Sequence, residues 1–334
     1  MAKYTMLVLT DHSTHFNENS VYPLVREMLK DPRCKGIDVA SRGVDLNRLF
    51  FEKMAVKSLY ATTAIHTFDY TEDGRFFKKD QHKVGLRSYD VVLLRLPHPI
   101  APGFWQFLEK EYPHVLFVNA PSGIELTGSK AFLLNFPTLC PPLRLCKSIE
   151  DIAEFKQPNP IVLKPLRSYA GLGIVKIEGE KVSKAEGGEL SWTAFTQMLQ
   201  GKNIEYLGAK FLKNVSQGDK RIVVCKGEIL GAALRMPAPG NWVCNVARGG
   251  KSSGAEADVD EQEIIRQIDP VLASHGIVFY GIDTLVGDDG KRVLSEINTV
   301  SIGGLPKIAE YSGRPVVGQA AGLLWDYIEA KLED

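Results

Sequence analysis

Three oxygen-bearing side chains near the end of the chain could bind a cation together. Asp283 lies in one apolar run, and Glu296 and Asn298 lie two residues apart in the next. The dipeptide Asp289-Gly290 between the runs favours a type I′ turn, which predicts an antiparallel hairpin. Because strand side chains alternate between faces, we expect Asp283 directly opposite Glu296, with Asn298 on the same face.

Two carboxylates placed opposite each other on neighbouring strands repel unless a cation lies between them. Ligands that are all oxygen suit a hard ion, and Mg²⁺ prefers one or two carboxylates together with water and substrate phosphates. The hairpin therefore predicts a site for a metal–nucleotide complex. The alternative is a solvated hairpin whose acidic residues are merely exposed.

Two lysines could hold the phosphates of such a nucleotide. Lys164 continues the apolar run 161–163, where an unpaired ammonium is costly to bury, so we expect an anionic partner. Gly171 and Gly173 follow and let backbone amides close over a ligand, although a plain glycine-containing hairpin would explain them too. Lys130 ends a near miss for a phosphate-binding loop, but it follows Ser129 where that loop needs the reverse order. A lysine that opens a helix at 131–135 could still meet a phosphate.

The N-terminal third predicts an α/β domain that ends near residue 121. Apolar runs at 4–9, 37–40, 90–94 and 115–119 read as strands, and the segments 17–30 and 104–111 between them show helical spacing. Strands that alternate with helices favour a parallel sheet.

The composition is that of an ordinary soluble globular protein of 334 residues, with 44% hydrophobic and 24% charged residues. Lys and Arg number 40, as do Asp and Glu, so the charge does not indicate a nucleic-acid or anionic-membrane binder. No apolar run is long enough to span a membrane and no signal-peptide pattern is seen, so we expect a cytoplasmic protein. The five scattered cysteines contain no CxxC pair and predict reduced thiols.

Seven short motifs taken together resemble the ATP-grasp superfamily, and most closely the bacterial glutathione synthetases. The resemblance is strong from about residue 117 to 300. The motifs occur in the family's order and spacing: Lys130, IVLKP at 161–165, GDKR at 218–221, LRMP at 234–237, NVARGG at 245–250, YGID at 280–283 and SEIN at 295–298.

The resemblance implies two α+β lobes that clamp Mg-ATP, and a role for each matching residue. Lys130 and Lys164 would hold phosphates under a lid that contains Ser168, Gly171 and Gly173. The backbone of Lys210, Phe211 and Leu212 would meet adenine and Asp219 the ribose. Asp283, Glu296 and Asn298 would bind magnesium. Arg235 and Asn245, with Lys164, would act on the transferring phosphoryl group.

The implied architecture is an N-terminal parallel-sheet domain over 1–121, a small lobe with the lid over 122–203, and a large lobe with the Mg-ATP site over 204–334. The implied reaction is ATP-dependent ligation of a small-molecule carboxylate to an amine through an acyl phosphate, as in joining γ-glutamylcysteine to glycine. Relatives of this kind often form homo-oligomers, so the resemblance also implies a homo-oligomer, for which the N-terminal domain would be the expected contact.

Departures from the family pattern leave two alternatives open. Val243 stands where the glutathione synthetases have an arginine near the phosphates, and the lid carries Arg167-Ser168-Tyr169-Ala170 in place of an Asp-Gly-rich sequence. The chain could therefore be an ATP-binding sensor or scaffold that has lost ligation. It could also be an amino-acid ligase that modifies a protein terminus.

Overall fold

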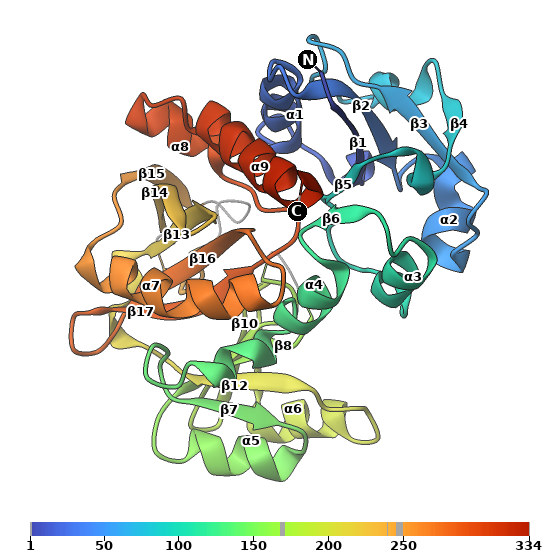
Figure 1. Cartoon of the computed structure of the whole chain (residues 1–334). Helices are drawn as coiled ribbons and strands as arrows, with labels where there is room; N and C mark the ends of the chain where they lie inside the picture. The colour runs from blue at the N-terminus through green and yellow to red at the C-terminus, as the bar shows by residue number, and fades with distance from the viewer. Residues whose placement is uncertain (1, 168–170, 239, 245–249, 334) are drawn as a thin grey trace.

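The computed structural model describes residues 2–167, 171–238, 240–244 and 250–333. Figure 1 shows three β-sheets with helices packed around them. The N-terminal domain lies at the upper right, the small lobe at the bottom, and the large lobe on the left between them.

The N-terminal sheet has the strand order β4-β3-β2-β1-β5-β6. Four consecutive strands of this order, β2, β1, β5 and β6, are parallel, as the alternation of strands and helices predicts. The sequence reading missed β3 and β4, which are short and antiparallel to their neighbours. The elements are β1 (Tyr4–Thr10), α1 (Val21–Leu29), β2 (Cys34–Ser41), α2 (Arg48–Lys53), β3 (Leu59–Thr63), β4 (His82–Val84), β5 (Val91–Leu94), α3 (Phe104–Glu111), β6 (Leu116–Val118) and α4 (Pro121–Thr127).

The small lobe is a six-stranded sheet of order β11-β10-β9-β8-β12-β7, with every neighbouring pair antiparallel. The predicted boundary at residue 203 is wrong, because β12 pairs with both β7 and β8 and so belongs to this lobe. The elements are β7 (Leu143–Cys146), α5 (Ile149–Lys156), β8 (Ile161–Pro165), β9 (Val175–Glu178), β10 (Lys181–Lys184), β11 (Glu189–Ser191), α6 (Trp192–Leu199) and β12 (Tyr206–Lys210).

The large lobe is a five-stranded antiparallel sheet of order β15-β14-β13-β16-β17. Its elements are β13 (Asp219–Cys225), β14 (Glu228–Met236), β15 (Lys251–Ala255), α7 (Val259–Ser274), β16 (Phe279–Val286), β17 (Arg292–Asn298), α8 (Leu305–Ser312) and α9 (Val316–Glu333).

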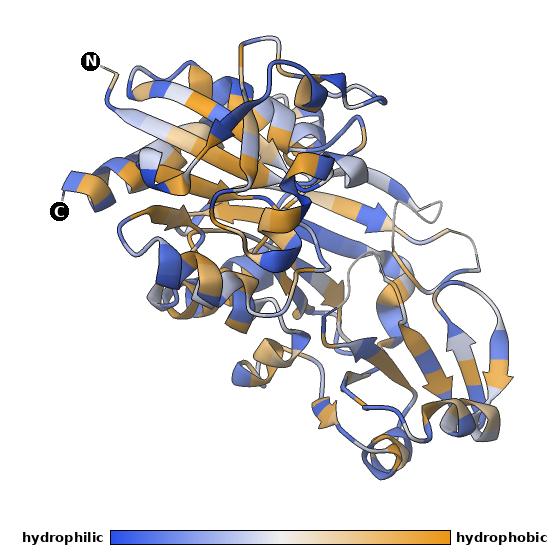
Figure 2. Cartoon of the chain, turned by 90° about the vertical axis from the view of Figure 1, so that its right-hand side faces the viewer, coloured by the Kyte–Doolittle hydropathy of each residue, from blue (hydrophilic) through white to orange (hydrophobic). Residues whose placement is uncertain are grey.

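The two faces of this sheet pack on different helices, because side chains alternate between the faces along each strand. Ile222 and Val224 of β13 point to the face that packs on α7, where Ile268 is fully buried. Val223 and Cys225 point to the other face, which packs on α8 and α9. Figure 2 shows hydrophobic and hydrophilic residues in short alternating bands along the strands. Towards the start of β13 the second face becomes polar, and it carries the residues discussed below.

The last helix joins the large lobe to the N-terminal domain. Trp325 of α9 is fully buried, and its indole N–H donates to the Met28 carbonyl at the end of α1 at 3.1 Å. Arg33 binds Asp326 and Glu329 of the same helix. The two units therefore share one core through α9. Among the helices that the structure describes, none has both the length and the apolar character needed to cross a bilayer.

Candidate functional site

The hairpin of β16 and β17 forms, but its turn differs from the prediction. Gly287 N–H donates to the Lys291 carbonyl at 2.7 Å, so the loop has three residues, 288–290. The Gly290 N–H donates to the Gly287 carbonyl at 3.0 Å, and Gly290 has φ +87°. This is a type I turn followed by a left-handed glycine, a common three-residue hairpin loop, and the predicted type I′ turn is wrong.

A β-bulge offsets the change of turn. Thr284 pairs with Leu294, whereas Asp283 pairs with Glu296, so Ser295 is an extra residue on β17. The loop shifts the register by one residue and the bulge shifts it back. Asp283 therefore lies opposite Glu296, as predicted.

The bulge also gives Lys164 its partner. Lys164 Nζ, on β8 of the small lobe, donates to the Ser295 carbonyl at 3.1 Å and to Ser295 Oγ at 3.0 Å. The groups that Lys164 contacts directly are thus neutral oxygens. The expected anionic partner, Glu296, is nearby but makes no direct contact of this kind. Burial lowers the pKa of the Lys164 ammonium, and the nearby Glu296 carboxylate opposes that shift.

Lys130 approaches the same carboxylate from another direction. It begins a 3₁₀-helix, Lys130–Asn135, where the sequence predicts a helix at 131–135. Its Nζ lies 3.2 Å from Glu296 Oε1, and the two side chains are 7% and 27% exposed. Both lysines that the sequence assigns to phosphates therefore lie close to Glu296.

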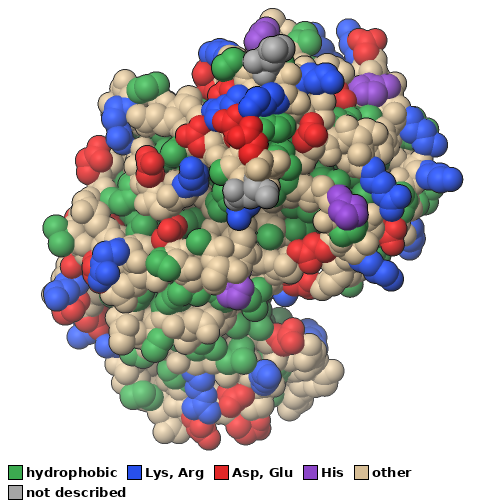
Figure 3. Space-filling view, in the orientation of Figure 1, with side chains coloured by type: hydrophobic (Ala, Val, Ile, Leu, Met, Phe, Trp, Pro, Cys, Tyr) green, Lys and Arg blue, Asp and Glu red, His purple; other side chains and the backbone are tan. Residues whose placement is uncertain are grey.

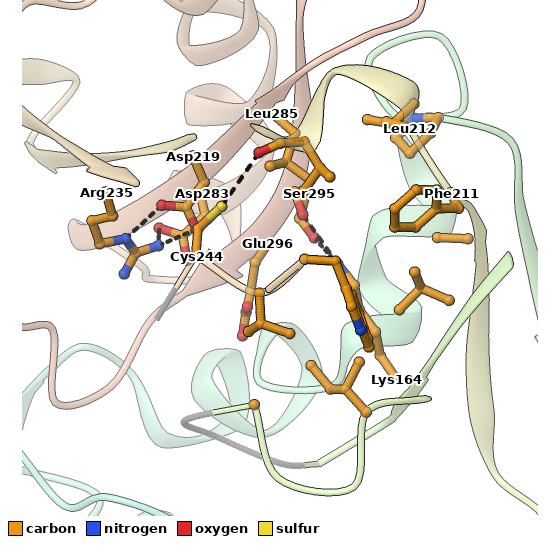
Figure 4. Close-up of a pocket in the computed structure, with 18 of the residues that line it drawn as sticks. Lys164, Phe211, Leu212, Asp219, Arg235, Cys244, Asp283, Leu285, Ser295 and Glu296 are labelled. Carbon is orange, nitrogen blue, oxygen red and sulfur yellow. Dashed lines mark hydrogen bonds and ion pairs between the residues drawn. The ribbon is translucent and has the colours of Figure 1, made fainter. Parts of the chain in front are cut away.

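Two arginines and two carboxylates form a second charged group on the same sheet face. Arg235 binds Asp219 through Nε at 2.6 Å and Nη2 at 2.8 Å, and its Nη2 lies 3.0 Å from Asp283. Arg221 donates to both oxygens of Asp283, from Nη2 at 2.7 Å and from Nε. Figure 4 shows Arg235 turned towards the two carboxylates.

The two carboxyls differ in their ionisation. Burial raises the pKa of Asp219 to about 6, against the opposing effect of the Arg235 guanidinium. Burial also acts to raise the pKa of Asp283, but two arginine partners outweigh it and hold that pKa below its ordinary range. Asp283 therefore stays a carboxylate at neutral pH.

The three predicted metal ligands share one face of the sheet, because Asp283 pairs with Glu296 and Gly281 pairs with Asn298. The donor set of two carboxylates and one amide is all oxygen and fits Mg²⁺. Asn298 Nδ2 is buried and has no hydrogen-bond partner in the described part of the chain, and a half-turn of the amide would present its oxygen there. Among the described residues, no three His, Cys, Asp or Glu side chains gather as a metal site by themselves. The amide is thus needed to complete the set.

A cavity of about 240 Å³ lies between the small-lobe and large-lobe sheets. The space-filling view of Figure 3 shows the molecule notched between the small lobe and the N-terminal domain on its right side. The predicted site residues that line the cavity are Lys164, Gly171, Lys210, Phe211, Leu212, Asp219, Arg235, Asp283, Glu296 and Asn298.

Among the described residues, Lys130 and Gly173 are predicted site residues that do not line the cavity. Lys130 reaches it through its contact with Glu296, and Gly173 lies two residues beyond Gly171 in the same loop. Both glycines have the positive φ that suits them to such a loop, +73° and +70°. Ser168 and Asn245 lie outside the described residues.

Sequence reasoning missed several residues of the site. Arg221 stands two residues after Asp219, so strand alternation alone could have placed it on the same face. Ser295 became a partner of Lys164 only through the bulge, which no residue pattern predicts. Trp242 lines the cavity from the connection between β14 and β15, and Lys176 lies over the Phe211 ring at 4.1 Å.

Comparisons with known proteins agree with this geometry. Residues 129–313 match the family described as "Prokaryotic glutathione synthetase, ATP-grasp domain". The glutathione synthetase of Bradyrhizobium diazoefficiens is 29% identical over 301 residues, which cover 88% of this chain and 91% of that protein. The glutathione synthetase of Agrobacterium fabrum is 30% identical over 301 residues, covering 88% and 89%.

Solved structures show the same fold at lower identity. D-alanyl-alanine synthetase A from Vibrio cholerae has a TM-score of 0.62 and 14% identity over the whole of both chains. D-cycloserine synthetase has a TM-score of 0.64 and 12% identity over 97% of this chain and 99% of that one. With two lobes, a shared cavity and the family match, the chain belongs to the prokaryotic glutathione synthetase family and is a ligase of the ATP-grasp type.

Proposed function

We propose that this ligase uses ATP to join a small-molecule carboxylate to an amine, with γ-glutamylcysteine and glycine as the first candidate pair. One observation carries the proposal. Lys164 of the small lobe and Glu296 of the large lobe line the same cavity, and Lys130 contacts Glu296 from a third segment. Cations and oxygen ligands drawn from separate segments suit a triphosphate with its metal.

The proposed reaction has two steps. A carboxylate is a poor electrophile, so its oxygen first takes the γ-phosphoryl group of ATP and ADP leaves. The amine nitrogen then attacks the acyl carbon, the bond from that carbon to the phosphate oxygen breaks, and phosphate leaves with an amide formed. Such transfers depend mostly on positioning and charge neutralisation, and no protein nucleophile is needed.

The chain's own residues would supply most of that neutralisation. Lys130 and Lys164 would bind phosphate oxygens, and Arg235 with Asn245 would steady the transferring phosphoryl group. The loop that contains Ser168, Gly171 and Gly173 would cover the phosphates, because an acyl phosphate exposed to water would hydrolyse. Phe211 and Leu212 would meet the adenine and Asp219 the ribose.

Asp283, Glu296 and Asn298 would hold Mg²⁺ in this scheme. Mg²⁺ bound there would neutralise negative charge on the phosphate oxygens. Asp283 and Glu296 have cationic partners in the structure: Arg221 and Arg235 contact Asp283, and Lys130 contacts Glu296. These cations would be released towards the substrates when the carboxylates bind the metal.

Arg95 supports an anionic acceptor. It follows β5, beside the point where the strand order of the N-terminal sheet reverses, and ligands bind at such points in open α/β sheets. Its side chain is 2% exposed and donates to the Ile302 carbonyl, while Nε and Nη1 have no partner among the described residues. Because an uncompensated buried cation favours an anion, we assign Arg95 to the acceptor carboxylate.

An Arg95→Met variant tests that assignment. Methionine fills similar space without a charge, so the fold should persist. The KM for the acceptor carboxylate should rise about tenfold or more, which corresponds to the loss of one charged hydrogen bond, while the KM for ATP stays unchanged. An equal rise in both constants would point to a general defect and contradict the assignment.

The reaction itself is tested by ADP release with Mg²⁺, ATP and a panel of γ-glutamyl and amino-acid substrates, with mass spectrometry of the products. Acceptor-dependent ADP release with a new amide product supports the proposal. ATP binding without product would favour a sensor or scaffold. Extended protein tails in a tryptic digest would instead favour a ligase that modifies a protein terminus.

A cytoplasmic location is part of the same proposal. All five cysteines are free thiols in the structure. Free, mostly buried thiols suit a reducing compartment, where disulfides are rare.

A further inference from the structure

Trp242 gives the cavity an aromatic wall that the family motifs do not contain. It lies in the connection between β14 and β15 and lines the cavity together with Phe211. The centroids of the two rings are 6.3 Å apart, with an interplanar angle of 73°. The large and small lobes thus each present an aromatic ring to the same space.

The backbone around Trp242 is fixed on both sides. Asn241 Oδ1 accepts hydrogen bonds from the N–H groups of Trp242 and Val243 at 2.8 and 3.1 Å. Cys244 is buried, and its Sγ lies 3.6 Å from the Val215 carbonyl. The indole is therefore placed by a short turn that is tied to the large lobe.

The aromatic and aliphatic side chains of the cavity lie apart from its arginine–carboxylate group. Figure 4 shows Phe211 and Leu212 on one side and Arg235 with Asp283 on the other. The charged side matches a triphosphate and its metal. The side lined by Phe211, Leu212 and Trp242 matches a flat, aromatic group of low polarity, which in a nucleotide is the base.

We propose that Trp242 is a binding residue that packs against the nucleobase and so sets a preference for nucleotides over bare phosphate chains. This inference rests on the proposed use of ATP. Contact between a base and an aromatic side chain does not depend on the phosphates. Removing the indole should therefore weaken the binding of ATP and leave the binding of an inorganic polyphosphate unchanged.

The test compares Mg-ATP with Mg-tripolyphosphate by calorimetry in the full chain and in Trp242→Ala and Trp242→Phe variants. We expect Trp242→Ala to weaken ATP binding about tenfold, within the range that base–aromatic contacts give. Trp242→Phe should recover most of the loss, and tripolyphosphate binding should stay the same in all three proteins. Trp192→Phe is the matched control, because it changes a tryptophan that lies beside Lys156 in the small lobe. It should change the affinity for neither ligand.

Fluorescence adds a second readout. Quenching of tryptophan emission by Mg-ATP should persist in the Trp192→Phe control and disappear in Trp242→Phe. Unchanged ATP affinity in Trp242→Ala, or an equal loss of affinity for ATP and tripolyphosphate, would overturn the proposed role of Trp242 but not the proposed use of ATP. No ATP binding by the unaltered chain would overturn it together with the proposed function.

Discussion

A substitution of Glu296 tests the proposed mechanism most directly. Its carboxylate lies 3.2 Å from Lys130 Nζ, faces Asp283 across the hairpin, and is a neighbour of Lys164. Glu296→Gln keeps the size of the side chain and one acceptor oxygen but removes the charge. The variant therefore separates the electrostatic role of Glu296 from its packing.

The structure sets the size of two expected effects. At 3.2 Å and an effective dielectric constant of about 20, the Lys130–Glu296 attraction is roughly 5 kcal/mol before desolvation is subtracted. Since Glu296 is 27% exposed and glutamine can still accept a hydrogen bond, we expect a loss of about 2 kcal/mol in unfolding free energy. Turnover should fall about 10²- to 10³-fold, equivalent to roughly 3 to 4 kcal/mol of transition-state stabilisation.

Denaturant unfolding and ADP release at saturating Mg²⁺ measure the two effects. Glu263→Gln is the matched control because it removes the same charge from an exposed ion pair with Arg266 on α7. It should change the unfolding free energy by less than about 0.5 kcal/mol and leave turnover unchanged. Wild-type turnover in Glu296→Gln would refute the metal-site reasoning, and equal losses in both variants would show a dependence on net charge alone.

Two further variants test separate parts of the structure. Lys164→Met removes a buried ammonium whose pKa is lowered by burial, so turnover should fall about 100-fold in the ADP assay while the thermal midpoint stays the same or rises. Burial lowers the pKa of His15, which bonds Thr10 and Tyr22, to about 4 from an ordinary 6.5. The neutral ring therefore stabilises the fold above pH 6.5, and this contribution is lost as the pH falls towards 4. Between pH 7 and pH 4, His15→Gln should lose about 2 kcal/mol less unfolding free energy than the wild type, by denaturant titration at each pH, and parallel curves would contradict this.

The hairpin shows how a correct prediction can rest on an incorrect step. The sequence predicts Asp283 opposite Glu296 from a two-residue turn, yet the structure reaches that pairing through a three-residue loop and a bulge at Ser295. Asp-Gly is compatible with either loop, because both need a glycine with positive φ at position 290. Strand alternation fixed which side chains share a face, and the turn type did not.

Contacts between distant segments were the hardest to predict. The apolar pattern of residues 204–212 indicates a strand but not its partners, and β12 pairs with β7 and β8 of the small lobe. The strands β3 and β4 are short and include polar residues, so no period-2 pattern marks them. Local patterns therefore gave elements and faces, while lobe membership depended on pairing across the chain.

The same limit explains why the sequence predicted many of the residues that line the cavity but not what they contact. The cationic residues assigned to phosphates and the carboxylates assigned to metal and ribose are oppositely charged groups that come from separate segments and meet around one cavity. In the structure these groups pair with each other: Arg235 binds Asp219, Arg221 binds Asp283 and Lys130 binds Glu296. In the proposed function, Mg-ATP would bring both charges at once: the carboxylates would bind the metal and the released cations would bind the phosphates. Binding would then exchange partners without leaving a buried charge unpaired, which is the condition that a buried ionic site must meet.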